Sequence, residues 1–202
     1  MGQRLVVTIE RKEKEIAKLY FHWSAYTGDA LYATRDIVHC IYNHKEETDR
    51  EMLLRLIRFC EERGGGIDSG NKGLAWQYIT TTYPGEKFKS DGISRSDGLI
   101  ALDEDTMEEM QRMSEGDVYI DLDEDQIDFC VYCGYDTLRE YVEERKSWDD
   151  EFEEFTIDEC PRVSYELGYI DVNDIDSLIE EFEGVEDNQN VIMFGNEIVE
   201  LI

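Results

Sequence analysis

Alternating apolar and polar positions open the chain and predict a β-hairpin. Residues 5–9 form a first apolar run, residues 11–15 a polar turn, and residues 16–23 a second run in which every other residue is apolar. Because successive side chains of a strand point to opposite faces, this pattern predicts two paired strands with one face on a core.

Helical spacing of apolar residues follows in residues 29–43 and again after residue 48. Thr48 and Glu51 have the spacing of a capping box, and glycines at 64–66 are suited to end the second helix. The apolar stripe of this helix is predicted to contain Leu53, Leu56, Ile57 and Cys60.

The rest of the chain predicts shorter elements. We expect helices over 74–82, 105–113, 136–146 and 171–182, strands over 117–122 and 127–132, and a closing hairpin of 191–194 with 198–202. Strands and helices follow one another without the regular alternation of a parallel sheet. This order favours an α+β fold of antiparallel β-hairpins with packed helices.

Charge divides the 202 residues into two halves. The chain has 20 Lys and Arg against 49 Asp and Glu, a net charge of −29. Residues 1–100 hold 15 acids and 15 bases, whereas residues 101–202 hold 34 acids and 5 bases. We therefore expect a charge-balanced α+β half and a strongly acidic α+β half, either as two units or as one continuous domain.

Composition excludes several classes of protein. The sequence has no run of about 18 apolar residues and no apolar leader, so we expect neither a membrane span nor a secretory signal. Direct binding to nucleic acid or anionic lipid is disfavoured by the negative charge. An odd number of cysteines predicts reduced thiols in the cytoplasm. They are Cys40, Cys60, Cys130, Cys133 and Cys160.

Motifs of redox and phosphate chemistry are incomplete. Cys130 and Cys133 lack a second pair for zinc, and their spacing on a strand points the thiols to opposite faces. Gly65 and Gly70 have P-loop spacing, but Asn71 stands where the lysine is required.

A calcium loop is incomplete as well. Asp121, Asp123 and Asp125 match the start of an EF-hand, but Gln126 and Tyr132 occupy the positions that need Gly and Glu. With no complete motif for a metal, a cofactor or a catalytic group, the sequence predicts a protein that is not an enzyme.

Acidic clusters are the candidate partner-binding sites. By the charge density of duplex DNA, 29 negative charges correspond to about 50 Å of duplex, or about 15 base pairs, so carboxylates here can stand in for phosphates. Aromatic anchors give such a surface affinity, unless they fold into the core and leave the acids merely solvated. The candidate residues are Trp148, Asp149, Asp150, Glu151, Phe152, Glu153 and Glu154, with Asp121, Asp123, Glu124 and Asp125.

A resemblance to a known type of protein is carried by residues 20–26, 97–100 and 116–122. With its acidity, the sequence resembles small acidic proteins of phages and prophages, some of which inhibit host defence nucleases as nucleic-acid mimics or anti-CRISPR proteins. The resemblance implies an anti-defence function and assigns no functional residues.

Our hypothesis is a non-enzymatic, cytoplasmic inhibitor whose acidic half engages a basic nucleic-acid-binding protein, such as a nuclease, and blocks access of nucleic acid. The alternative is a small-molecule or nucleotide-binding protein, or an enzyme, with a pocket in the N-terminal half, near His22, Trp23 and Tyr26 or the loop 64–73. A third interpretation is an acidic structural or regulatory protein that needs neither partner nor ligand.

Overall fold

The computed structural model describes residues 4–25, 27–68, 87–88, 90–91, 97–131, 170–184, 191–194 and 197–200. Two of the predicted helices, over 74–82 and 136–146, lie outside these residues.

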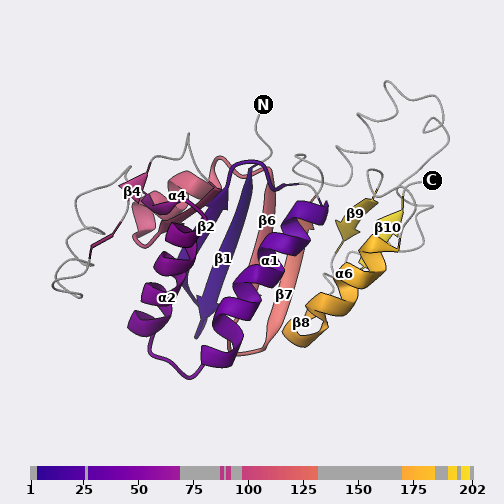
Figure 1. Cartoon of the computed structure of the whole chain (residues 1–202), viewed down its shortest axis with the longest axis horizontal. Helices are drawn as coiled ribbons and strands as arrows, with labels where there is room; N and C mark the ends of the chain where they lie inside the picture. Colours follow the sequence, from indigo (N-terminus) through magenta and orange to yellow (C-terminus); the bar gives the residue numbers. More distant parts are fainter. Residues whose placement is uncertain are drawn as a thin grey trace.

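One mixed sheet crosses the molecule (Figure 1). Within the described ranges it has ten strands in the order β10-β9-β7-β6-β1-β2-β5-β3-β4, and β8 pairs with β7. The strands are β1 Leu5–Arg11, β2 Lys14–Phe21, β3 Gly66–Asp68, β4 Ser90–Asp91, β5 Asp97–Ala101, β6 Gly116–Asp121, β7 Gln126–Val131, β8 Ile170–Asp171, β9 Val191–Phe194 and β10 Glu197–Glu200.

Strand pairing confirms the predicted α+β class and corrects its details. The three predicted hairpins, β1–β2, β6–β7 and β9–β10, are antiparallel. The sheet also contains parallel pairs, which the sequence did not predict: β1 with β6, and β3 with both β4 and β5. Hairpins carry a local turn signal, whereas Leu5 lies opposite Gly116, so the sequence gives no local signal for that pair.

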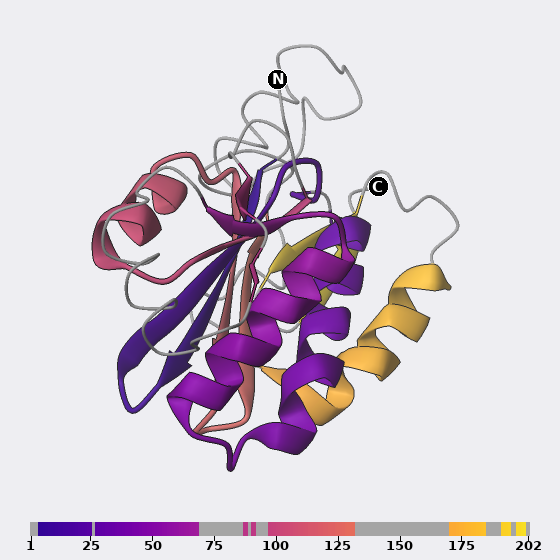
Figure 2. The same cartoon turned by 60° about the vertical axis from the view of Figure 1, so that its left-hand side comes forward.

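Helices cover both faces of the sheet, as Figure 2 shows. The described helices are divided between the two faces. On the first face are α1 Thr27–Ile41, α2 Asp49–Glu62 and α6 Ile175–Glu183, with the short 3-10 helices η1 Tyr42–His44 and η4 Val172–Asp174; on the second is α4 Glu104–Gln111. None of these helices is long and apolar enough to span a bilayer.

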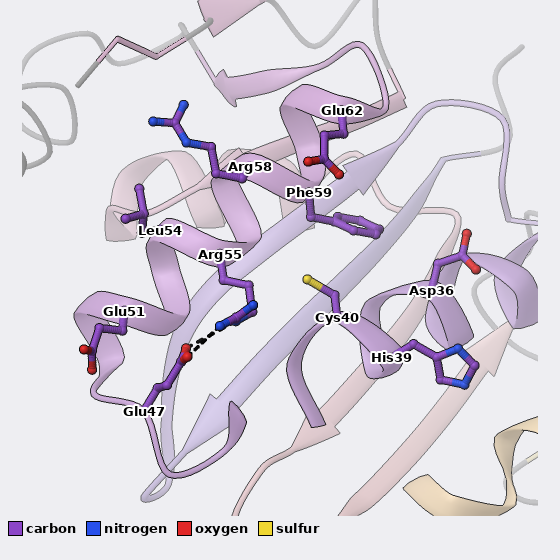
Figure 3. A pocket seen from close by; sticks show the side chains of 10 residues that line it. All are labelled: Asp36, His39, Cys40, Glu47, Glu51, Leu54, Arg55, Arg58, Phe59 and Glu62. Carbon is purple, nitrogen blue, oxygen red and sulfur yellow. Dashed lines mark hydrogen bonds and ion pairs between the residues drawn. The ribbon is translucent and has the colours of Figure 1, made fainter. Parts of the chain in front are cut away.

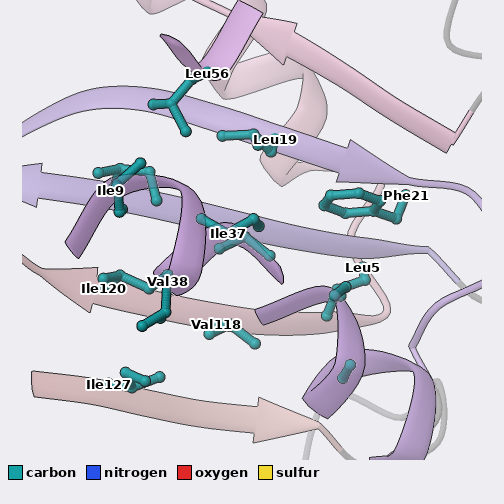
Figure 4. Packing of buried hydrophobic residues seen from close by; sticks show 14 of the residues in the cluster. Leu5, Ile9, Leu19, Phe21, Ile37, Val38, Leu56, Val118, Ile120 and Ile127 are labelled. Carbon is teal, nitrogen blue, oxygen red and sulfur yellow. The ribbon is translucent and has the colours of Figure 1, made fainter. Parts of the chain in front are cut away.

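The main core lies between the sheet and its first face of helices (Figure 4). Leu5, Val7 and Ile9 of β1 are fully buried and belong to one cluster with Ile37 of α1 and Leu56 of α2. The intervening residues point to the second face, where a smaller cluster forms under α4. That cluster consists of Val6, Tyr20, Leu99, Ala101, Met107 and Met110.

Local signals explain where the elements begin and end. The β1–β2 turn is tighter than predicted and is made by Lys12 and Glu13, both in the left-handed region with φ of 54° and 58°. The capping box of Thr48 and Glu51 is present, and Gly64, with φ of 94°, follows the end of α2.

Two helices begin elsewhere than predicted. The helix predicted over 105–113 begins one residue earlier: Asp103 accepts the backbone N–H of Thr106 and caps α4, which starts at Glu104. The predicted helix over 171–182 starts as the 3-10 helix η4 and becomes α6 only at Ile175.

The sheet joins the two halves of the sequence. β6, from the acidic half, lies next to β1, from the balanced half, and residues of both halves share the main core. At the lower end of Figure 1 the β1–β2 turn, the β6–β7 turn and β8 come together.

Candidate functional site

A row of acidic residues crosses the second face of the sheet, away from α1, α2 and α6. Strand register sets its members side by side on five neighbouring strands. At a strand spacing of about 4.8 Å the row extends over about 19 Å. We call it the acidic row, although one of its five members is an amide. In order across the strands the members are Glu15, Glu10, Asp121, Gln126 and Asp171.

Beside the acidic row lies a pocket of about 410 Å³, which we call the sheet pocket. Tyr119 of β6 and Asp128 of β7 lie opposite each other in the next row of the same face. Together with Glu10, Asp121 and Gln126 they line the pocket. Three carboxylates, an amide and a phenol therefore converge on one concave surface.

Asp128 is the most unusual residue of the sheet pocket. It is only 7% exposed, and its Oδ1 has no hydrogen-bond partner. Its Oδ2 lies 4.0 Å from Sγ of Cys130, a weak donor. Burial raises the pKa of Asp128, although the backbone N–H of Phe129 opposes the shift. These contacts compensate an ionised carboxylate only in part, so its burial is costly unless a cation pairs with it.

The pKa values of two other pocket residues, Glu10 and Tyr119, are shifted in the same sense. The pKa of Glu10 is raised by burial and by the neighbouring charges of Glu15 and Asp121. Burial, with the charge of Asp117, raises the pKa of Tyr119 to about 12. The pocket thus favours the neutral form of each of these acids, as expected where negative groups crowd together away from water.

Lys18 compensates only one end of the acidic row. Its buried Nζ lies 3.1 Å from Oγ1 of Thr8, 3.0 Å from a carboxylate oxygen of Glu15 and 2.9 Å from Oε1 of Gln111. The positive charge lowers the pKa of Glu10 less than its acidic neighbours raise it. Because Lys18 lies at the Glu15 end, the part of the row from Asp121 to Asp171 is the more negative one.

Of the predicted turn acids, Asp121 lines the sheet pocket and also builds the β6–β7 turn, while Asp123 and Asp125 connect that turn to other parts of the chain. Oδ1 of Asp121 accepts the backbone N–H groups of Asp123 and Glu124 at 2.8 and 3.1 Å. Asp123 accepts the backbone N–H of Lys12, and Nζ of Lys45 contacts both carboxylate oxygens of Asp125 at 3.0 and 2.7 Å.

The predicted turn acids also differ in solvent exposure. Asp123 and Glu124 are exposed, whereas Asp121 and Asp125 are half-buried. The other predicted cluster, Trp148 with Asp149, Asp150, Glu151, Phe152, Glu153 and Glu154, lies outside the described residues.

In the part of the chain that the structure describes, no three His, Cys, Asp or Glu side chains are arranged to hold a metal ion. Cys130 of the Cys-x-x-Cys motif is half-buried and burial raises its thiol pKa to about 12, while Cys133 lies outside the described ranges.

The candidate aromatic pocket of the N-terminal half is only partly described. Nδ1 of His22 lies 2.7 Å from the hydroxyl of Tyr20, and the rings of His22 and Trp23 meet edge to face at 4.7 Å. The Trp23 residue is 56% exposed. Tyr26 and most of the loop 64–73, from residue 69 on, lie outside the described residues.

A second concave surface among the described residues lies between α1 and α2 (Figure 3). We call it the helix groove. It has a volume of about 640 Å³ and is lined by Cys40 of α1 and by Arg55 and Arg58 of α2. Arg55 forms an ion pair of 2.5 Å with Glu47, and Arg58 one of 2.6 Å with Glu61. Its arginines are therefore already paired, and burial raises the pKa of the Cys40 thiol.

Sequence reasoning missed Glu10, Tyr119 and Asp128. A signal did exist for Asp128, because aspartate is depleted in strands and here stands between Ile127 and Phe129. No local signal links it to Glu10, which only the parallel β1–β6 pairing brings near.

Comparison with protein-family models gave no match, and comparisons with curated proteins and with solved structures gave none either. Function is therefore inferred from the geometry and chemistry of the acidic row and the sheet pocket.

Proposed function

We propose that this is a non-enzymatic binding protein that uses its acidic sheet face to engage a basic nucleic-acid-binding protein and so blocks access of nucleic acid. The observation that carries the proposal is the acidic row with the sheet pocket beside it. Carboxylates there stand next to one another on neighbouring strands, and burial and mutual repulsion raise the pKa of Glu10.

Charge around this face supports a cationic partner. The hairpin 116–131 holds six acids and no Lys or Arg, and the adjoining strand β8 adds Asp171 to the same face. The two segments are joined where Gln126 pairs with Asp171. Such a field attracts a positively charged surface over a long range and speeds its association.

The resemblance to acidic phage and prophage proteins supports an inhibitory purpose for this binding. A surface that occupies the Lys and Arg groove of a nuclease excludes its nucleic acid by competition for the same cations. In this proposal the protein acts in the cytoplasm as an anti-defence inhibitor.

The test is affinity capture followed by competition. The immobilised protein is exposed to bacterial lysate at low salt, bound proteins are eluted with a salt gradient, and each captured protein is purified and re-bound with and without duplex DNA or RNA. We expect a basic nucleic-acid-binding protein that salt releases and nucleic acid displaces.

A matched pair of variants connects that result to the acidic row. Glu10→Gln with Asp121→Asn removes two charges from the row, and the Asn retains an oxygen for the turn N–H groups. Glu180→Gln with Glu181→Gln removes two charges from exposed positions of α6. We expect the first pair to slow association roughly tenfold at low salt and the second by less than about twofold.

Equal effects of the two pairs, or capture that nucleic acid cannot displace, would contradict the proposal.

The helix groove supports a second candidate function, the binding of a small molecule in the N-terminal half. Its volume of about 640 Å³ is in the range of ligand pockets. We favour the first function because the groove arginines are paired, whereas Asp128 in the sheet pocket is not. A thermal shift of several degrees with a small molecule, lost in Arg55→Gln, would favour the second.

A further inference from the structure

The sheet pocket contains a buried carboxyl group with one unpaired oxygen. Asp128 is more than nine-tenths buried, and its Oδ1 is without a hydrogen-bond partner. Native proteins rarely leave such an acceptor unpaired, and where they do, an absent ligand is one of the explanations. Since register puts Asp128 on the same face as Tyr119, Asp121 and Glu10, its carboxylate belongs to the concave surface that they line.

We propose that the sheet pocket receives the guanidinium group of an arginine side chain of the basic partner, with Asp128 as its buried acceptor. This inference rests on the proposed function and names the chemical group that the site recognises. Glu10 and Asp121 are further acceptors in the same pocket, and the ring of Tyr119 is its aromatic surface.

Guanidinium fits the arrangement of acceptors better than a metal ion does. A metal ion needs several ligand atoms within about 2.6 Å of one point, and no group of His, Cys, Asp or Glu in the described ranges is arranged in that way. A guanidinium carries five N–H donors on a planar fork and can reach acceptors that are spread over neighbouring strands.

Arginine is also favoured over lysine. Guanidinium is more weakly hydrated than ammonium, so it loses less on entering a pocket that is poor in water. It pairs with a carboxylate through two parallel hydrogen bonds and stacks on an aromatic ring such as that of Tyr119. Because the pKa of Tyr119 is raised to about 12, its phenol stays neutral and adds no negative charge near pH 7.

The size of the sheet pocket is suited to one side chain. About 410 Å³ lies at the low end of the range for ligand sites, large enough for a guanidinium and its stem and too small for a folded element of the partner. The acidic row continues on both sides of Glu10 and Asp121, where further cations of the partner would remain solvated.

The experiment compares nona-arginine with nona-lysine, two peptides of equal charge. Their affinities for the whole protein are measured by fluorescence anisotropy in a low-salt buffer at pH 7. General attraction to an acidic surface is the same for both peptides, so we expect at least about tenfold tighter binding of nona-arginine. We expect Asp128→Asn to remove most of that preference and to leave nona-lysine within about twofold.

Glu180→Gln, at an exposed position of α6, is the matched single-charge control and should weaken both peptides equally. Circular dichroism checks the fold of each variant. If Asp128→Asn does not fold, Glu10→Gln tests the same pocket from a half-exposed position and should lower the arginine preference severalfold.

Equal binding of the two peptides, or an arginine preference that survives both pocket variants, would overturn the guanidinium pocket. In that case salt-dependent binding of both peptides would leave the proposed function standing. Failure of the protein to bind either peptide would contradict both the pocket and the wider proposal.

Discussion

Single residues of the sheet pocket oppose the stability of the folded protein. Asp128 is buried without a cation, and the pKa of Glu10 is raised by burial and by its acidic neighbours. A residue selected for stability alone would be neutral at the position of Asp128, because an unpaired buried charge lowers the stability of the fold. Such local frustration is common at functional sites.

Asp128→Asn should therefore stabilise the protein at neutral pH. Burial raises the folded-state pKa of Asp128 above the unfolded value of about 3.9. Below the unfolded pKa the carboxyl is protonated in both states, and its burial then costs no charge desolvation. As pH rises through the folded pKa the buried group ionises and the wild type loses stability. Asn does not titrate. We expect the melting temperature of the variant to exceed that of the wild type at pH 7, and the difference to shrink toward zero near pH 3.5.

Thermal denaturation followed by circular dichroism between pH 3.5 and 8 measures this difference. Glu180→Gln, whose wild-type side chain is exposed, is the control and should show little pH dependence relative to wild type. A less stable Asp128→Asn at pH 7 would mean that the carboxylate is compensated in the folded protein.

Individual elements are specified by short local signals. α2 begins at a capping box in which Thr48 accepts the backbone N–H of Glu51 while the Glu51 carboxylate accepts the backbone N–H of Thr48. Its stripe of Leu53, Leu56 and Ile57 packs into the main core. The cap and the apolar stripe both predict the same helix, so its start could be predicted from the sequence.

Thr48→Ala should lower the free energy of unfolding by about 1 kcal/mol, because it leaves a helical N–H without its acceptor. Thr48→Ser retains a hydroxyl and should lie within a few tenths of a kcal/mol of wild type. Urea denaturation measures both variants. Equal stability of the Ala and Ser variants would mean that the cap contributes nothing beyond side-chain size.

At the scale of the whole molecule, the excess of negative charge opposes compactness. The net charge is −29, and the acidic segments 116–131 and 170–184 are joined where β7 pairs with β8. Repulsion of this kind acts over distances that salt controls. A cationic partner would relieve it, so binding and folding stability should be coupled.

Salt should stabilise the free protein. Raising the NaCl concentration from 0.01 to 1 M shortens the Debye length from about 30 Å to about 3 Å, well below the 19 Å length of the acidic row. We expect the melting temperature to rise over this range, and to rise less in Glu10→Gln with Asp121→Asn. A melting temperature that is unchanged or falls with salt would show that repulsion does not limit stability.

The sequence by itself determined the local elements of this protein and its charge. Turn residues, a capping box and apolar periodicity are interactions between neighbours, so the three hairpins and α2 could be predicted from nearby residues alone. The strong acidity of the second half is likewise a property of composition.

Only the tertiary structure decided where a site can exist. Glu10 and Asp121 become neighbours because β1 and β6 pair in parallel, and that pairing depends on helices packing over both strands. Asp128 is buried and unpaired only in the assembled sheet. Burial and long-range pairing are properties of the packed chain, and they turn acids that look alike in the sequence into a pocket, a turn and a solvated surface.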